Sequence, residues 1–219
     1  EIVLSFGKPM DVLGNFVDQN GVSYDRHKRV VEVKEYFISD GKVKSDLQRE
    51  TEYTRMLGKR IVERYHKENI VLSSHLIAYV IFKILQKQNP SLDLYGLLRL
   101  PSEDYQFDLN AVRSAVRQMQ EQLFEMEGKG HIKLSKEIQG DTDALIKDGV
   151  SKLGIFHPQK TLKYNKSGNI ESENFRILYF YHNRLSTYQF KPIKWNQIAG
   201  DQKERQGAQK QKNNLQKTS

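Results

Sequence analysis

The sequence is most apolar at His75-Leu76-Ile77-Ala78-Tyr79-Val80-Ile81-Phe82-Lys83-Ile84-Leu85. Apolar side chains would lie almost all round a helix formed by this run, which indicates a helix buried in a core. Ser73 or Ser74 can cap its start, and Pro90 cannot continue it, so we predict a helix from His75 to Gln88. The run is far shorter than the ~20 residues of a membrane-spanning helix, and we expect a soluble or peripheral protein.

Further helices are predicted on both sides of this core helix. Ser45 or Asp46 can cap a helix from Leu47 to about Lys67, whose apolar side chains follow a loose 3–4 spacing. A regular apolar stripe predicts another helix from Leu109 to Glu127, after Asp108 as its cap. Shorter helices are expected over residues 92–100, 143–153 and 175–190.

Strand signals are fewer. We predict strands over residues 2–6, 30–38 and 131–134, and a hairpin of 161–164 with 169–170 around Ser167-Gly168. The expected fold is therefore α/β at the N-terminal strand, which would complete an upstream sheet, followed by a mainly α-helical domain with a small hairpin. The division that we predict is 1–44, 45–190 and a disordered tail over 191–219.

The composition favours anionic partners. The 219 residues carry a formal net charge of +8, and the stretch 201–219 holds five basic against two acidic residues. Such a balance suits nucleic acid, acidic lipid surfaces or phosphorylated substrates, although an ordinary solvated surface is an equal alternative. Cysteine is absent, which excludes disulfides and cysteine-based zinc sites.

No catalytic set is visible from spacing alone. The sequence has six histidines but no paired-histidine helical zinc motif, no nucleophile elbow and no Walker loop. Ser73-Ser74-His75 could suggest a nucleophile and its base. Adjacent residues at a helix start rarely point at each other, so we interpret the serines as caps and His75 as a core residue.

The element order from Ser73 to Glu171 is compatible with a winged helix, which raises nucleic-acid binding as an alternative function. The candidate recognition helix, residues 143–153, holds Lys147 and Lys152 against Asp143 and Asp148. That is a poor electrostatic footprint for a duplex. A non-catalytic interaction module with a basic tail is the remaining alternative.

A family resemblance enters at Leu4-Ser5-Phe6-Gly7-Lys8-Pro9-Met10. This stretch resembles the last of four conserved blocks of the bacterial glycerol-3-phosphate acyltransferase family, where a strand leads into Phe-Gly-x-Pro. Two later stretches are similar to the same family, namely Asn69 to Ala78 and Leu178 to Arg184. The three stretches lie in the family's order, so the resemblance spans Glu1 to Phe190.

The resemblance implies an enzyme of phospholipid synthesis that joins an acyl thioester, from acyl-CoA or acyl carrier protein, to the sn-1 hydroxyl of glycerol 3-phosphate. It implies no cofactor and no metal. The family's general base is the histidine of a His-x4-Asp block, and none of the six histidines has Asp five positions later. We therefore expect a C-terminal portion that lacks its upstream acyltransferase partner and is inactive alone.

The residues that match the family's fourth block are Phe6, Gly7 and Pro9, which the resemblance places beside the acyl-donor pocket. Glycine lets a backbone pass close to a ligand, and proline fixes a turn after a strand. Lys8 could approach a phosphate of the donor, and Asn183 and Arg184 are candidates for a structural polar network. We expect a peripheral protein at the cytoplasmic face of the cell membrane, held on anionic lipid by the basic tail and helix 175–190.

Overall fold

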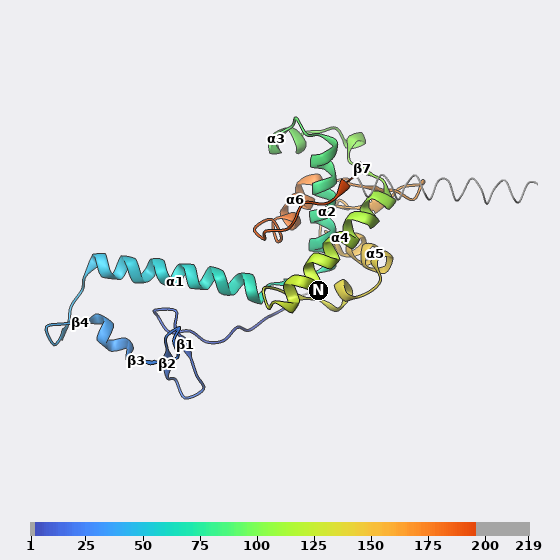
Figure 1. Cartoon of the computed structure of the whole chain (residues 1–219). Helices are drawn as coiled ribbons and strands as arrows, with labels where there is room; N and C mark the ends of the chain where they lie inside the picture. Colours follow the sequence, from blue (N-terminus) through green and yellow to red (C-terminus); the bar gives the residue numbers. More distant parts are fainter. Residues whose placement is uncertain (1–2, 196–219) are drawn as a thin grey trace, which may run out of the picture. The chain divides into compact units, whose positions relative to one another are not determined.

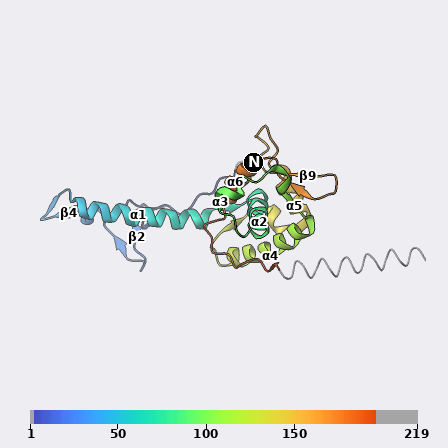
Figure 2. The same cartoon turned by 90° about the horizontal axis from the view of Figure 1, so that it is seen from above.

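The computed structural model describes residues 3–195, and its fold is mixed α/β and mainly helical (Figures 1 and 2). The chain divides into two compact units: Glu1–Ile70 with Gly130–Lys133, and Val71–Lys129 with Leu134–Ser219. We predict that residues 1–44 form the last part of an acyltransferase domain. The two units divide the chain at a different place, and this assignment stays a prediction. Most of the predicted tail, residues 196–219, lies outside the described residues.

The N-terminal unit begins with short antiparallel strands. β1 (Phe16–Val17), β2 (Ser23–Tyr24) and β3 (Val30–Val31) form one sheet in that order, and β4 (Ile38–Ser39) pairs with β5 (Lys42–Val43).

The single strand predicted over residues 30–38 is wrong. The chain leaves β3 and forms a 3-10 turn over Val33–Phe37. The rings of Tyr36 and Phe37 both lie near Tyr53, with centroids 5.9 and 6.0 Å away. Consecutive residues of a strand point to opposite faces, so a continuous strand could not bring both rings to one partner.

The long helix of this unit is α1 (Leu47–Glu68), as predicted. Asp46 caps it by accepting a hydrogen bond from the Arg49 amide at 3.1 Å. No residue of α1 is buried. Among the described residues of the unit, only two apolar side chains are buried, those of Leu13 and Ile132. The N-terminal unit therefore has almost no hydrophobic core of its own.

The second unit is built around α2 (Ser73–Gln88), which is buried along most of its length, as its composition predicted. The helices α4 (Leu109–Gly128), α5 (Thr142–Lys152) and α6 (Phe175–His182) pack against it (Figures 1 and 2). The predicted cap at Ser73 or Ser74 is wrong, because the N-cap is Leu72 and both serines lie inside the helix. The short α3 (Leu94–Leu97) follows α2.

A three-stranded antiparallel sheet completes the second unit. β10 (Ile170–Glu171) lies between β7 (Gln106–Phe107) and β9 (Lys163–Tyr164). Leaving aside the short α3 and β8, the chain order α2, β7, α4, α5, β9, β10 with β10 central is compatible with the winged helix of the sequence analysis, in which the β9–β10 hairpin would be the wing. β6 (Ile70–Val71) and β8 (Lys133–Leu134) form a separate pair.

The last helix is shorter than predicted. α6 ends at His182 rather than near residue 190, and residues 183–195 run through turns into an extended segment. The side-chain amides of α4 hold this segment: Gln122 Oε1 accepts from the Lys191 amide at 2.7 Å, and Gln118 Oε1 accepts from the Lys194 amide at 2.8 Å. These contacts hold residues 191–194 along α4, where the predicted helix would have ended.

The apolar face of α6 is buried. Phe175, Leu178 and His182 point into the core, and the Phe175 ring stacks on Phe82 of α2 with centroids 5.9 Å apart. Phe180 of the same helix is 62% exposed, and the predicted contact of helix 175–190 with anionic lipid stays a prediction. Within the part of the chain that the structure describes, no helix is long and apolar enough to cross a membrane.

Candidate functional site

The segment that carries the family resemblance, residues 3–9, is extended but forms no strand. The strand predicted over residues 2–6 is thus wrong for the part that the structure describes. The first pairing in the chain is the isolated bridge between Met10 and Phe16, and Pro9 O accepts a hydrogen bond from the Val17 amide at 3.1 Å. A strand needs a neighbouring edge, and no described strand pairs with residues 3–9.

Ser5 anchors this segment to the C-terminal end of α1. Its hydroxyl donates to Glu68 Oε2 at 3.2 Å and accepts from Lys133 Nζ at 2.9 Å, while Lys133 also forms an ion pair with Glu68. The hydrogen bond from Lys133 holds the pKa of the Glu68 carboxyl below its ordinary value. Three side chains distant in sequence therefore fix where the segment begins.

The three predicted site residues follow this anchor directly. The Phe6 side chain is 89% exposed and that of Leu4 is 75% exposed, and Pro9 is exposed as well. Gly7 lies against α1, where a Cβ would come within 3.2 Å of Glu68 Cγ. The structure thus brings Phe6, Gly7 and Pro9 together on one exposed stretch, and residues 3–195 leave the side chains of Leu4 and Phe6 largely uncovered. Lys8 is turned toward Phe16, with its Nζ 5.5 Å from the ring centroid.

The turn after Pro9 is built by residues that the sequence analysis missed. Asp11 Oδ1 accepts from the amides of Leu13 and Asn15, both at 2.8 Å. Arg60 of α1 donates through Nη1 to Leu13 O and to Asn15 Oδ1, again at 2.8 Å. Gly14 has φ +79°, which a side chain rarely adopts. An Asp three residues before a Gly is the local turn signal that could have indicated this loop.

Ser73-Ser74-His75 is not a nucleophile with its base. The Ser73 hydroxyl donates to Asp148 Oδ2 at 2.6 Å, and His75 Nδ1 accepts from the Leu72 amide at 3.3 Å. Burial lowers the pKa of His75 to about 4, so its imidazole is neutral near pH 7. Both side chains fasten the start of α2, and the interpretation of His75 as a structural residue holds.

His182 lies in a buried aromatic cluster. Its ring centroid is 5.3 Å from that of Tyr79, 4.2 Å from Phe82 and 5.4 Å from Tyr179, and the side chain is 5% exposed. Nδ1 lies 3.3 Å from Asn183 Oδ1, whereas Nε2 has no hydrogen-bond partner among the residues that the structure describes. Burial lowers its pKa to about 4. Asn183 thus takes part in a polar contact of this cluster, and Arg184 is exposed.

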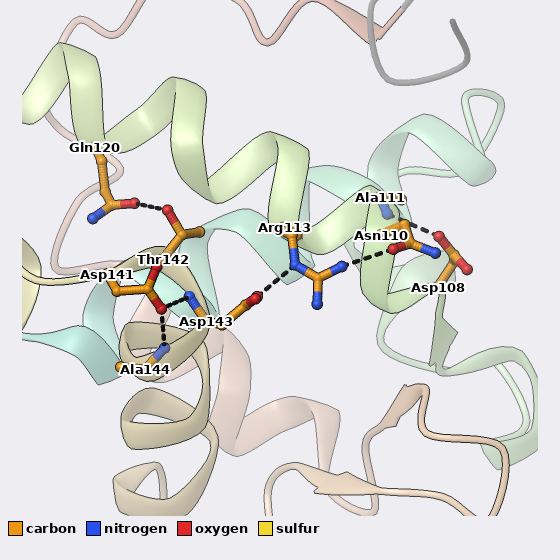
Figure 3. Close-up of polar contacts among 9 residues, drawn as sticks. All are labelled: Asp108, Asn110, Ala111, Arg113, Gln120, Asp141, Thr142, Asp143 and Ala144. Carbon is orange, nitrogen blue, oxygen red and sulfur yellow. Dashed lines mark hydrogen bonds and ion pairs between the residues drawn. The ribbon is translucent and has the colours of Figure 1, made fainter. Parts of the chain in front are cut away.

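Side chains at the start of α5 contact α4 (Figure 3), Lys152 at its end pairs with Asp148 and Glu137, and Lys147 is exposed. Asp143 accepts from Arg113 Nε of α4 at 2.5 Å, and Arg113 also donates to Asn110 Oδ1 at 2.7 Å. The Thr142 hydroxyl donates to Gln120 Oε1 at 2.8 Å, and Asp141 caps α5. The helix that would face a nucleic acid therefore offers little free positive charge.

No protein-family model, curated protein or solved structure matches this chain. Within residues 3–195, no group of three or more histidine or carboxylate side chains is arranged to hold a metal ion. The resemblance to the acyltransferase family therefore stays a prediction from the sequence.

Proposed function

We propose that this chain is the C-terminal part of a membrane-associated glycerol-3-phosphate acyltransferase. The intact protein would transfer an acyl group from acyl-CoA or acyl carrier protein to the sn-1 hydroxyl of glycerol 3-phosphate. The catalytic His-x4-Asp block would belong to an upstream acyltransferase portion. Residues Phe6, Gly7 and Pro9 would form part of the wall of the acyl-donor pocket.

The observation that carries the proposal is the state of the Phe-Gly-Lys-Pro segment. It is extended, anchored at Ser5, and presents Leu4 and Phe6 with nearly all of their apolar surface uncovered. Burying one such side chain contributes roughly 1.5–3 kcal/mol, so a segment of this kind is stabilised by a partner. An acyltransferase sheet that gains residues 3–6 as a strand would pair their backbone and cover Leu4 and Phe6.

The rest of the N-terminal unit supports the same partner. Its helix α1 has no buried residue, and exposed apolar side chains recur along the unit: Val12, Val30, Val43, Leu47, Val62 and Tyr65. Monomeric proteins rarely leave so much apolar surface open, and such surfaces commonly mark interaction sites. A unit that belongs to a larger acyltransferase domain accounts for this lack of a core.

Gly7 and Pro9 have separate roles in this proposal. Gly7 has no side chain between the segment and Glu68, which lets the backbone of Phe6 and Lys8 stay close to α1. Pro9 restricts the backbone where the chain turns toward the Met10–Phe16 bridge. Phe6 is then free to face a bound acyl chain.

The proposal is tested in the intact protein by a Phe6→Ala substitution. We expect KM for the acyl donor to rise roughly tenfold while KM for glycerol 3-phosphate stays unchanged, because the lost side chain contacts only the acyl chain. Tyr95→Ala removes another exposed aromatic ring, 71% exposed, from α3 and is the control. An intact protein without acyl-transfer activity, or a Phe6→Ala variant with unchanged kinetics, would contradict the assignment.

Nucleic-acid binding is the second candidate, and the winged-helix arrangement of the second unit is the observation that favours it. A duplex-binding protein should lose affinity steeply as salt rises and should prefer certain sequences. Because Asp143 and Asp148 offset the lysines of α5, we expect only weak binding without sequence preference. Salt titrations with duplex DNA distinguish the two functions.

A further inference from the structure

The loop between α5 and β9, residues 154–161, presents two apolar side chains to solvent. Ile155 is 55% exposed and Phe156 is 84% exposed. We call this segment the Phe156 loop. Neither residue belongs to the three stretches that resemble blocks of the acyltransferase family, and the proposed function gives them no role.

The two ends of the Phe156 loop are packed together at Gly154 and Thr161. Gly154 has φ +74°, and a Cβ at this position would overlap the side chain of Thr161 at the other end of the loop. The His157 amide donates to Gly154 O at 2.9 Å. The two ends of the loop are therefore packed against each other, and only a glycine fits at position 154.

The connection between β10 and α6, residues 172–174, also holds the Phe156 loop. The Ser172 hydroxyl donates to Thr161 O at 2.8 Å, and the Lys160 amide donates to Glu173 Oε2 at 3.1 Å. Asn174 Nδ2 donates to Gln159 Oε1 at 2.9 Å. Because the base is fixed at several points, the exposure of Ile155 and Phe156 is a property of the folded unit.

The sequence around this tip is cationic. Residues 149–170 contain Lys152, Lys160, Lys163 and Lys166 and no carboxylate. Lys152 forms an ion pair within α5, at 3.1 Å to Asp148, and Lys163 of β9 forms one with Glu173 at 2.6 Å. The hydrogen bond from Lys163 lowers the pKa of Glu173, and the charge of Lys160 also helps to lower it. Lys160, within the loop, and Lys166, at the tip of the wing, are both exposed. Positive charge beside an apolar tip is complementary to an anionic surface with an apolar interior.

We infer that the Phe156 loop inserts Ile155 and Phe156 into the interface of an anionic lipid bilayer, with Lys160 among the headgroups. Two side chains cover far less area than a stable protein interface needs, whereas a small apolar tip next to lysines suits the headgroup boundary. The inference rests on the proposed function, because it names the part of the chain through which the membrane-associated enzyme would contact lipid. It adds a membrane contact to the one that we predict for helix 175–190, in which Phe175, Leu178 and His182 of α6 are buried.

The absence of cysteine allows a direct test with the whole chain. A Phe156→Cys variant is labelled with an environment-sensitive fluorophore and mixed with vesicles of phosphatidylcholine, with or without phosphatidylglycerol. We expect a blue shift with the anionic vesicles at low salt. The same label in Tyr95→Cys, an exposed position on α3, should not shift. No shift at position 156, or equal shifts at both positions, would overturn the inference.

Binding affinity gives a second readout. Replacing Ile155 and Phe156 by serine should lower the partition coefficient on anionic vesicles roughly tenfold or more, since both side chains leave the interface. Tyr95→Ser should leave it unchanged. Unaltered partitioning of the double variant would overturn the inference. A blue shift of the fluorophore at position 156 with rising protein concentration and no lipid would also overturn it, because the tip would then bind a second copy of the chain. Neither assay needs acyl transfer, so failure of the proposed function is recognised separately.

Discussion

Gly149 of α5 lies so close to Ile77 of α2 that a Cβ at position 149 would overlap Ile77 Cγ1 and come within 2.9 Å of Ser73 O. The two helices can approach this closely because one of them has no side chain at the crossing. Asp148, next to Gly149, accepts a hydrogen bond from Ser73 of α2 at 2.6 Å. This contact fixes α5 on the core helix of the second unit.

A Gly149→Ala substitution should therefore destabilise the second unit by about 2–3 kcal/mol, because the added methyl group forces two packed helices apart. Urea denaturation followed by circular dichroism measures the change. Gly128→Ala is the matched control, since Gly128 ends α4 and a Cβ there would meet nothing within 4 Å. Equal stability of both variants would show that the helices separate at little cost.

His182 makes the stability of the second unit depend on pH. Its folded-state pKa is lowered to about 4 against a usual value of 6.5, so the unfolded chain binds the proton more tightly. Stability should be full above about pH 6.5 and fall as the pH drops toward 4, by up to roughly 3 kcal/mol from this residue. His75, whose pKa is lowered in the same direction, should add to the loss.

A His182→Phe variant tests this account. Phenylalanine keeps the ring contacts with Tyr79 and Phe82 and removes the titrating nitrogen, so the fall in unfolding free energy between pH 6.5 and 4 should become smaller. His157→Gln changes an exposed histidine and should keep the wild-type profile. A His182→Phe profile as steep as that of the wild type would contradict the assignment.

Gly14 should be the most sensitive glycine of the N-terminal unit. Its φ is +79°, and a Cβ would lie 2.6 Å from Arg60 Cδ, which holds the turn after Pro9. Gly14→Ala should thus cost about 1–2 kcal/mol of backbone strain and also displace Arg60. Gly21→Ala should cause the backbone strain without a steric clash, because φ is +78° at Gly21 and no atom lies within 4 Å of the position of a Cβ. Hydrogen exchange of the Leu13 and Asn15 amides should accelerate more in Gly14→Ala than in Gly21→Ala.

Gln120 should be coupled to Thr142 across the α4–α5 contact. Its Nε2 donates to Ile138 O at 2.9 Å while its Oε1 accepts from Thr142, and the side chain is buried. Gln120→Met should cost about 1–3 kcal/mol by leaving these groups unpaired. A double-mutant cycle with Thr142→Val should show a coupling of about 1 kcal/mol, and additive losses would contradict the contact.

The helices whose signals are local could be predicted from the sequence. The helix predicted from Leu47 to about Lys67 ends at Glu68, and the helix predicted from Leu109 to Glu127 ends at Gly128. Both predictions were close because the apolar spacing and the caps Asp46 and Asp108 lie within or beside each helix. The predicted strand is absent from residues 3–6 because a strand depends on a partner that lies elsewhere in the sequence. The end of α6 at His182 was also missed, and the segment after it contacts α4, which is distant in sequence.

The candidate site was predicted only in part. Phe6, Gly7 and Pro9 could be named because they are contiguous and resemble a family block. The anchor of the segment could not be named, since Ser5 meets Lys133 across 128 residues of sequence. The role of Arg60 could not be predicted either, because its partners Leu13 and Asn15 lie 47 and 45 residues away in the sequence.

The central claim is tested most directly by the activity of the intact protein that contains this chain. Labelled glycerol 3-phosphate and an acyl thioester are supplied, and the lipid product is isolated and its acyl position determined. Our account predicts a product acylated at the sn-1 hydroxyl and no product from the 219-residue chain alone. An intact protein that forms no acylated product with either acyl-CoA or acyl carrier protein would contradict it.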